Sequence, residues 1–351
     1  MRRAVDIVDG LGVDELMLAA IDATRSTYPH PNPRVGAVIV TPDHTVLSLG
    51  VCHGDGLAHA ETTALDALSD SSLAKGATAI VTLEPCSHQG RTPPCTDALI
   101  NAGIAKVVVG AVDPDPRVSG SGIRRLSEAG VEVLTGIANE AVIAADPAYF
   151  HHRQFGIPRV TLKMAATLDG QAAALDGTSQ WITSAEARDD VHRLRSENDA
   201  VLVGAGTVIA DDPSLTVRRD GYEGPQPLPI VVVGNREIPR ESKVMERDPL
   251  MYGLETQGSV DLAEMLKDLG SRGIMSVLVE GGPTLARSFV TSGTVDSFVW
   301  YVAAKLAAGT GFPAIAGRFE SIAEALDLIV VDVQMVGPDI RVTAVPTEGS
   351  A

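Results

Sequence analysis

The sequence contains His59-Ala60-Glu61 and, further along, Pro85-Cys86 and Cys95. One imidazole and two thiolates are three zinc ligands, whereas a structural zinc site normally has four ligands from the protein. The fourth position is therefore left for water, whose pKa zinc lowers to about 7. Glu61 is a nearby carboxylate that can relay protons. This spacing predicts a catalytic zinc site built around a helix that begins near His59.

The His-x-Glu and Pro-Cys pattern is typical of zinc deaminases that act on nucleobases, in which the second cysteine follows after two residues. Here eight residues separate Cys86 from Cys95. A chance grouping and a structural metal site are the alternative interpretations. Both are disfavoured, because the pattern has neither Cys-x-x-Cys partners nor a fourth ligand.

The length and charge of the chain limit its function. A chain of 351 residues is long for one core and suggests two domains. With 28 basic and 45 acidic residues, the formal net charge is −17, which repels a long polyanion. Nucleic acid is thus disfavoured as a partner, but a single phosphate on a small metabolite is compatible with one local pocket.

The sequence predicts a cytoplasmic protein with no membrane partner. No stretch approaches the roughly 18 to 20 apolar residues needed to cross a bilayer, and residues 1–6 lack the apolar core of a signal peptide. The chain has three cysteines, two of them assigned as ligands, which fits a reducing compartment. We expect the third, Cys52, to be a small buried residue.

Hydrophobic periodicity predicts that helices and strands alternate in the first half. Helices are expected at 13–25, from 59 onward, from Cys95 onward, at 123–129 and at 140–147, and strands at 35–40, 46–50, 78–83, 106–110 and 131–133. A packed connection at 149–158 follows, so we place the domain boundary near residue 155.

The second half carries near-continuous apolar strands, which are typical of a mainly parallel sheet covered by helices. They lie at 160–165, 200–204, 229–234, 277–280 and 295–302. A capping box at 183–186 begins a helix that runs toward Ser196. Two glycine turns, 204–207 and 280–286, are candidates for binding a dinucleotide, the second because Pro283 opens a helix. An ordinary tight turn is the alternative for each.

The first half resembles the RibD family of bifunctional riboflavin biosynthesis enzymes over 30–36, 59–61 and 84–95. The resemblance implies a cytidine-deaminase-like α/β/α sandwich, with His59, Cys86 and Cys95 on Zn²⁺ and Glu61 as the proton shuttle. It also implies that Asn32, His53 and His88 lie in the substrate pocket. Ala58 stands where the family commonly has proline.

The second half resembles the reductase domain of the same family over 163–170, 179–184, 208–218 and 280–284, with Thr167 where serine is frequent. This implies a dihydrofolate-reductase-like α/β domain that uses NADPH. By position, the residues facing NADPH would be Ala165, Trp181, Thr207, Asp211, Gly282, Pro283, Thr284, Leu285, Ala286, Arg287 and Ser288; those facing substrate would be Ser179, Arg195, Leu215, Arg218 and Glu280. Arg195 and Arg218 suit a phosphate, and Lys163 suits the polarisation or protonation of the sugar oxygen.

Together these resemblances imply a deaminase domain at 10–150 and a reductase domain at 156–346. The expected substrate is a phosphoribosylaminopyrimidine, first deaminated and then reduced. A homodimer or homotetramer through the reductase domain is also implied, with the strand at 298–301 as a candidate contact or, alternatively, a core strand. Two other functions stay open: a zinc deaminase that edits nucleic acid such as tRNA, fused to a non-reductase domain, and a noncatalytic zinc-stabilised protein.

Overall fold

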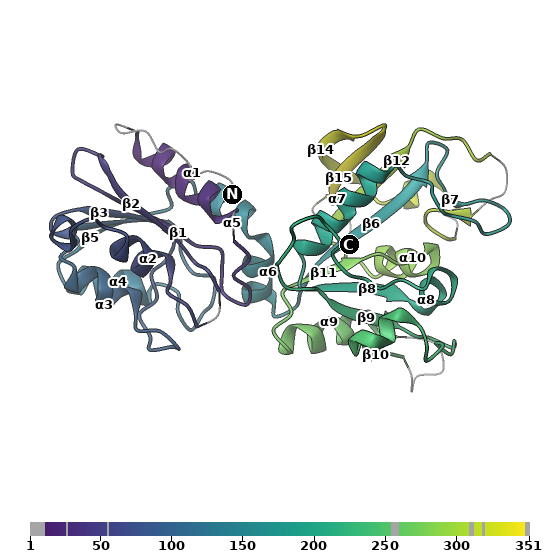
Figure 1. The fold of residues 1–351 in the computed structure, drawn as a ribbon, viewed down its shortest axis with the longest axis horizontal. Helices are drawn as coiled ribbons and strands as arrows, with labels where there is room; N and C mark the ends of the chain where they lie inside the picture. Colours follow the sequence, from purple (N-terminus) through teal and green to yellow (C-terminus); the bar gives the residue numbers. More distant parts are fainter. Residues whose placement is uncertain are drawn as a thin grey trace. The chain divides into compact units, whose positions relative to one another are not determined.

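The computed structural model describes residues 11–25, 27–54, 56–253, 260–308, 312–317 and 320–347. The chain divides into two compact units between Phe155 and Gly156 (Figure 1). Residues 1–6, where we expected no signal peptide, lie outside the described ranges. Within those ranges no helix is both long enough and apolar enough to cross a membrane.

The first unit is built on a five-stranded sheet with the order β2-β1-β3-β4-β5. β1 pairs antiparallel with β2 and β3, whereas β3, β4 and β5 run parallel. The central strands are buried along nearly their whole length because helices cover both faces. The strands are β1 (Gly36–Val40), β2 (Val46–Val51), β3 (Thr78–Leu83), β4 (Lys106–Ala111) and β5 (Glu132–Thr135).

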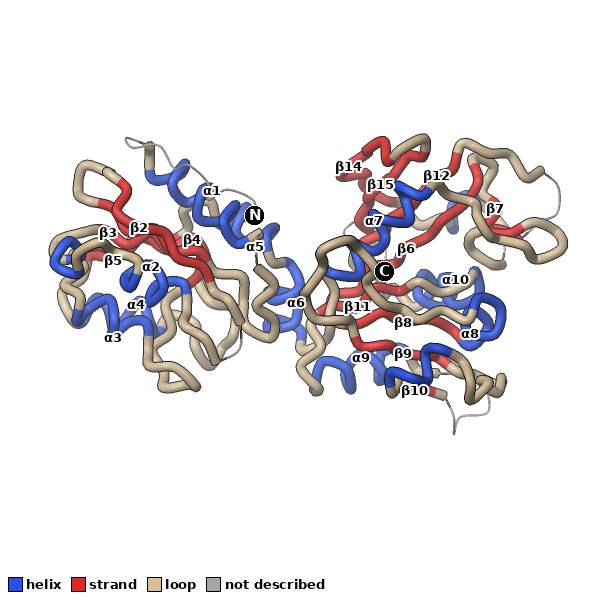
Figure 2. Tube along the Cα trace, viewed as in Figure 1, coloured by secondary structure: helices blue, strands red, loops and turns tan. Residues whose placement is uncertain are grey.

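Helices lie on both faces of this sheet and make a three-layer sandwich (Figures 1 and 2). α1 (Val13–Thr24) and α5 (Asn139–Ala145) pack on one face; α2 (Ala60–Asp66), α3 (Cys95–Asn101) and α4 (Ser121–Glu128) pack on the other, with η1 (Ser71–Ala74) after α2. α2 approaches β2 closely at Gly50, where a Cβ atom would lie 2.3 Å from the carbonyl oxygen of Ala60. Glycine at this position lets the helix that carries Glu61 sit directly on the sheet.

The expected connection after the first sheet is instead a helix, α6 (Pro147–Phe155). Pro147 is the first residue of α6, where its missing amide is tolerated. Tyr149 and His152 are buried, so the segment packs, as its aromatic content indicated. The helical form of this connection was not predicted, because the helix is short and its apolar side chains are mixed with polar ones.

The second unit has an eight-stranded sheet with the order β10-β9-β8-β11-β6-β12-β15-β14. The first six strands are parallel, as the apolar runs predicted, whereas β15 and β14 extend the sheet antiparallel. Its strands are β6 (Arg159–Thr167), β8 (Ala200–Gly204), β9 (Leu228–Val232), β10 (Leu250–Tyr252), β11 (Ser276–Val279), β12 (Ser297–Ala303), β14 (Leu328–Val336) and β15 (Asp339–Pro346). β7 (Gln171–Ala173) and β13 (Phe312–Pro313) form a separate pair.

The second sheet is also covered on both faces, which produces two cores. α7 (Ala185–Ser196) and α8 (Ala205–Asp211) pack over one core; α9 (Leu262–Ser271) and α10 (Pro283–Thr291) pack over the other, with short 3-10 turns at η2 (Lys243–Arg247) and η3 (Ile322–Glu324). The expected capping box at 183–186 does not form: Ser184, not Thr183, is the N-cap of α7, and its hydroxyl accepts from the amide of Ala187. The strand at 298–301 is a core strand, because Phe298, Val299 and Tyr301 are buried between β6 and β15.

Candidate active sites

Three donor atoms meet at the starts of α2 and α3 in the first unit. His59 is the N-cap of α2, Cys95 is the first residue of α3, and Cys86 follows β3. Nδ1 of His59 lies 3.6 Å from Sγ of Cys86 and 3.3 Å from Sγ of Cys95. All three donor atoms lie within 4.8 Å of one another, and no fourth such ligand joins them in the described part of the chain.

This donor set fits zinc. Zinc binds sulfur at about 2.3 Å and imidazole nitrogen at about 2.0 Å, so a tetrahedral arrangement separates neighbouring donors by roughly 3.5 Å. Hydrogen bonds from Cys95 and His59 lower the pKa of Cys86 to about 4. The neighbouring Cys86 sulfur, together with burial, raises the pKa of Cys95. Two adjacent thiolates repel each other, and a dication between them removes that repulsion.

Glu61 lies in the first turn of α2, two residues after His59, and is only 3% exposed. Burial raises the pKa of Glu61 to about 7, and the charge of Cys86 adds to the rise. The Glu61 carboxyl group is also within hydrogen-bonding reach of the Cys95 sulfur. The Glu61 carboxyl group therefore lies beside the donor cluster.

The segment that carries Cys86 is held by the buried carboxylate of Glu84. Oε2 of Glu84 accepts from the amide of Gly120 at 2.9 Å, and Oε1 accepts from the amide of Gly122 at 2.9 Å. A Cβ atom at Gly122 would lie 2.0 Å from the carbonyl oxygen of Pro85, so the start of α4 needs glycine there. These contacts fix the end of β3, from which Cys86 reaches the donor cluster.

A cavity of about 210 Å³ opens beside the donor cluster. Asn32 and His88, both predicted substrate residues, line it, and the side-chain amide of Asn32 donates to the carbonyl oxygen of Gly54 at 3.0 Å. His53, also predicted, is exposed and is not among the lining residues. The remaining lining residues are Gly56, His59, Cys86, Gly90, Arg91 and Thr92.

In the second unit, the predicted residues Lys163, Arg195 and Glu280 form one charged cluster. Nε and Nη2 of Arg195 donate to the two carboxylate oxygens of Glu280 at 2.6 and 3.1 Å. Nζ of Lys163 lies 3.8 Å from Glu280 Oε2. Although burial opposes it, the charges of Arg195 and Lys163 lower the pKa of Glu280 to about 2. Burial lowers the pKa of Lys163, and Glu280 opposes that change.

The loop that follows α8 brings Arg218 close to this cluster. Nη1 of Arg218 donates to the hydroxyl groups of Ser214 and Thr216, and Nη1 of Arg195 donates to the carbonyl oxygen of Thr216 at 3.0 Å. Arg218 is exposed, whereas all three Arg195 nitrogens are already engaged by Glu280 and Thr216. Of the two arginines, Arg218 is therefore the one with its guanidinium open to solvent.

The two predicted glycine turns lie next to each other at the carboxyl ends of β8 and β11. A Cβ atom at Gly282 would meet only Thr207 Oγ1, at 3.6 Å. Gly282 is the N-cap of α10, Pro283 follows it, and the first turn of α10 has no acidic residue. Ligands of open α/β sheets bind at this edge. Bare amides at a helix start suit the pyrophosphate of a dinucleotide, so the residues present fit NADPH.

Family models match both halves of the chain. Residues 13–111 match the cytidine and deoxycytidylate deaminase zinc-binding region, and residues 158–342 match the RibD C-terminal domain. The riboflavin biosynthesis protein RibD of Mycobacterium tuberculosis is 41% identical over 338 residues, covering 95% of this chain and 97% of that protein.

The chain belongs to the RibD family. Two solved structures agree with this membership. RibD of Acinetobacter baumannii has a TM-score of 0.91 at 35% identity and covers 96% of this chain and 99% of that chain. A Thermotoga maritima protein described as a diaminohydroxyphosphoribosylaminopyrimidine deaminase/5-amino-6-(5-phosphoribosylamino)uracil reductase has a TM-score of 0.85 at 32% identity, with 95% and 99% covered.

Membership in the RibD family confirms the expected fold class and the expected pair of activities. The enzyme joins a zinc-dependent deaminase domain to an NADPH-dependent reductase domain and acts in riboflavin biosynthesis. The nucleic-acid editing alternative is not favoured, because the second half matches a RibD reductase domain.

The structure separates the remaining predicted residues of the RibD reductase domain by exposure. The side chains of Leu215 and Ala286 are buried in the cores, so only their backbone atoms are available to a ligand. Trp181 is 61% exposed, and its ring lies 4.4 Å from the Arg188 guanidinium carbon. Ser179, Ala165 and Thr207 are half-buried; Asp211 is exposed and contacts Gln180.

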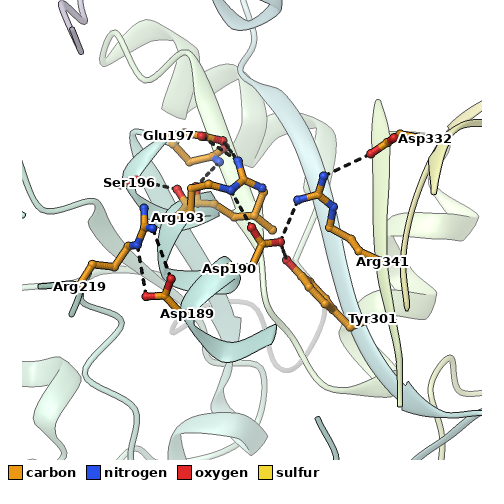
Figure 3. A network of polar contacts seen from close by, with 11 residues as sticks. Asp189, Asp190, Arg193, Ser196, Glu197, Arg219, Tyr301, Asp332 and Arg341 are labelled. Carbon is orange, nitrogen blue, oxygen red and sulfur yellow. Dashed lines mark hydrogen bonds and ion pairs between the residues drawn. The ribbon is translucent and has the colours of Figure 1, made fainter. Parts of the chain in front are cut away.

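Sequence reasoning missed several residues beside these sites. Thr92 contacts the ring of His59, and Tyr301 places its ring 5.9 Å from Nζ of Lys163. The Tyr301 hydroxyl donates to Asp190 at 2.6 Å, within the network that Figure 3 shows. Thr92 lies within the 84–95 motif and Tyr301 within the strand at 298–301, but the sequence assigned neither side chain a role.

Proposed function

We propose that the first domain, residues 10–150, deaminates 2,5-diamino-6-(5-phosphoribosylamino)pyrimidin-4(3H)-one to 5-amino-6-(5-phosphoribosylamino)uracil. The second domain, residues 156–346, then reduces the ribosyl group of that product to ribityl. The observation that carries the proposal is the cluster of three donors beside buried Glu61, in a chain whose other half matches the RibD reductase domain. The Thermotoga maritima relative is described as a deaminase of a diaminohydroxyphosphoribosylaminopyrimidine and a reductase of the aminouracil.

In the deaminase domain, His59, Cys86 and Cys95 would hold zinc. When bound, zinc supplies Lewis acidity and makes water nucleophilic at neutral pH. Glu61 accepts a proton from the water that attacks C2 and delivers it to the departing amino nitrogen, which leaves as ammonia. Asn32 and His88 bind the pyrimidine from the cavity wall. We assign His53, which is exposed, to the mouth of the site.

In the reductase domain, Lys163 donates a proton to the sugar oxygen as the carbonyl carbon is reduced. Its position beside Glu280 supports this role. Arg195 orients Glu280 through a two-point ion pair, and Arg218 binds the substrate phosphate together with the hydroxyls of Ser214 and Thr216. Ser179 and the backbone of Leu215 complete the substrate site.

NADPH, when bound, supplies the hydride. The start of α10 would hold its pyrophosphate, since Gly282 leaves the turn open toward Thr207. We also assign Trp181 and Asp211, which are exposed, and Ala165 of β6 to the cofactor site. The α10 residues assigned to NADPH are Gly282, Pro283, Thr284, Leu285, Ala286, Arg287 and Ser288.

The reductase domain would also form the oligomer. β14 is an edge strand, and Ile329, Val331, Val333 and Met335 on it are each more than half exposed. An apolar edge strand in water invites pairing with another chain. We therefore propose a homodimer or homotetramer through this strand, in place of the strand at 298–301.

We also assign the enzyme to the cytoplasm. Cys86 and Cys95 serve as metal ligands in this proposal, and thiolate ligands fit a reducing compartment.

One assay tests both activities. The phosphoribosyl diaminopyrimidinone is supplied with and without NADPH, and ammonia and cofactor absorbance are followed together. Ammonia should appear in both reactions, and NADPH should be consumed only in the first. Cys86→Ser should abolish ammonia release yet still reduce the deaminated substrate, whereas Lys163→Ala should do the reverse. Ammonia release by the Cys86→Ser variant at the wild-type rate would refute the metal assignment.

A further inference from the structure

The loop between the two cysteines holds a hydroxyl group against the metal-ligating histidine. Residues 87–94 have no regular secondary structure, and both ends of the loop are fixed at Cys86. The amide of Cys95 donates to Cys86 Sγ at 3.4 Å, and the amide of Thr96 donates to the carbonyl oxygen of Cys86 at 3.1 Å. The two ends of the loop therefore lie next to each other, beside Cys86.

Thr92 lies inside this loop and is fixed by it. The carbonyl oxygen of Thr92 accepts from the amide of Gly90 at 3.3 Å and from the side-chain amide of Gln89 at 3.4 Å. Oγ1 of Thr92 lies 3.3 Å from Nε2 of His59. These two residues are 33 positions apart, so only the return of the loop brings them together.

The two ring nitrogens of His59 therefore face different partners. Nδ1 points at the two sulfurs, and Nε2 points at the Thr92 hydroxyl. A neutral imidazole that gives its Nδ1 lone pair to a metal carries its proton on Nε2. That N–H can donate to the hydroxyl oxygen of Thr92. A hydrogen-bond partner of this kind fixes the tautomer and the ring orientation of a ligating histidine.

His59 needs such a partner because α2 does not orient its ring. His59 is the N-cap residue, but its side chain makes no capping hydrogen bond. Only its carbonyl oxygen is engaged by the helix, through the amide and the hydroxyl of Thr63. The backbone of His59 is thus fixed by Thr63, and the ring is fixed by Thr92.

We propose that Thr92 is a positioning residue that holds His59 in the tautomer and orientation that bind zinc through Nδ1. The proposal rests on the proposed metal site at His59, Cys86 and Cys95. It also gives a purpose to the eight-residue spacing between the cysteines: a two-residue spacer would contain no residue equivalent to Thr92. Thr92 acts through His59 and takes no part in the proton transfers assigned to Glu61.

The test measures the zinc affinity of the full-length protein by competition with a chelator. Thr92→Val keeps the shape of the side chain but removes the hydroxyl, and we expect about tenfold weaker zinc binding, at the lower end of the losses known when a ligating histidine loses its hydrogen-bond partner. Thr92→Ser restores the hydroxyl and should bind zinc as the wild type does. Thr63→Val is the matched control, since it removes a hydroxyl that touches the backbone of His59 but not its ring.

The outcomes separate this inference from the proposed function. Zinc affinity that is unchanged in Thr92→Val, with a raised KM for the pyrimidine, would overturn the inference and make Thr92 a substrate contact. Equal losses in Thr92→Val and Thr92→Ser would also overturn it, because the hydroxyl would not be the cause. Wild-type zinc binding that survives His59→Ala would instead refute the metal site itself. A far-ultraviolet circular dichroism spectrum and a thermal melt like those of the wild type check that the first unit of each variant is folded.

Discussion

In the proposed mechanism, the side chain of Glu61 makes the deaminase site a catalyst as well as a metal-binding site. Glu61→Gln keeps the volume but removes the group that accepts a proton. We expect zinc content to stay at the wild-type level, since Glu61 is not a ligand, while ammonia release falls by at least about 100-fold. Metal analysis and an ammonia assay on the same sample give both values. A variant that loses its metal but keeps its activity would contradict this role.

The reductase reaction should depend on the protonation of Lys163. Burial holds the pKa of Lys163 below its ordinary value of 10.5, and the negative charge of Glu280 partly restores it. A proton donor works in its charged form, so the rate of reduction should fall as the pH rises through this lowered pKa. Glu280→Gln removes the charge that raises the pKa and leaves Arg195 unpaired nearby, so the alkaline loss should move to lower pH.

The measurement is the pH profile of NADPH oxidation with the deaminated substrate. Control reactions with Lys163→Ala should show little turnover at any pH. An alkaline limb that stays in place in Glu280→Gln would argue against Lys163 as the titrating group. Unchanged turnover in Lys163→Ala would remove the residue from the mechanism.

At the level of single residues, the sequence predicted the groups that lie in motifs. His59, Cys86 and Cys95 meet as their spacing indicated, and Cys52 is buried as expected. The contact of Thr92 with His59 was not predictable, because it depends on the path of an irregular loop. The pairing of Arg195 with Glu280 joins residues 85 positions apart, and charge alone did not say which arginine would be occupied.

At the level of elements, α7 is attached to the sheet through a network around Asp190 (Figure 3). The Asp190 carboxylate accepts hydrogen bonds from Tyr301 of β12 at 2.6 Å, from Arg341 of β15 at 2.8 Å and from Arg193 at 2.7 Å. The side chains of Asp190 and Arg341 are 14% and 13% exposed. The hydrogen bond to Asp190 fixes the hydroxyl end of Tyr301, and the ring of Tyr301 lies near Lys163.

Asp190→Ala should destabilise the second unit by about 3 kcal/mol, since it leaves Arg341 buried without its main partner. Asp189→Ala is the matched control. Asp189 pairs with Arg219 at the surface, where such pairs contribute less than about 1 kcal/mol. Urea unfolding followed by tryptophan fluorescence reports this unit, because both tryptophans, Trp181 and Trp300, belong to it. Equal effects of the two substitutions would contradict the assigned importance of Asp190.

The same residue gives the stability of this unit a dependence on pH. Although burial opposes it, Arg193, Tyr301 and Arg341 lower the pKa of Asp190 to about 2 from its ordinary value of 3.8. A depressed carboxyl pKa stabilises the folded state above the unfolded value, and this contribution is lost as the pH falls toward 2. The difference in stability between wild type and Asp190→Ala should therefore shrink between about pH 4 and pH 2.

The elements with strong periodicity were predictable, and those decided by tertiary packing were not. β3 matches its predicted range, and the parallel strands of the second sheet follow their apolar runs. β14 and β15 were missed because β14 is apolar yet exposed, so it does not alternate as a half-buried strand would. The predicted start of α7 was one residue too early, because Thr183 and Ser184 are both good capping residues.

On the scale of the whole molecule, each unit has its own sheet with helices on both faces, so the two activities have separate scaffolds. Length and composition were enough to predict this division, because one core rarely serves 351 residues. The net charge of −17 agrees with a small substrate whose phosphate meets one local arginine. What composition did not predict is the exposed apolar strand β14.

We therefore predict that β14 forms the contact between chains in the oligomer. Val333 and Met335 are 59% and 66% exposed on this edge strand. Replacing both with lysine places charges on the edge and should prevent pairing between chains. Light scattering should then give the 36.6 kDa mass of one chain, whereas the wild type should give at least twice that mass. Leu73→Lys, an exposed apolar residue of the first unit, should leave the mass unchanged. A wild-type monomer, or a double variant that stays assembled, would rule out β14 as the contact.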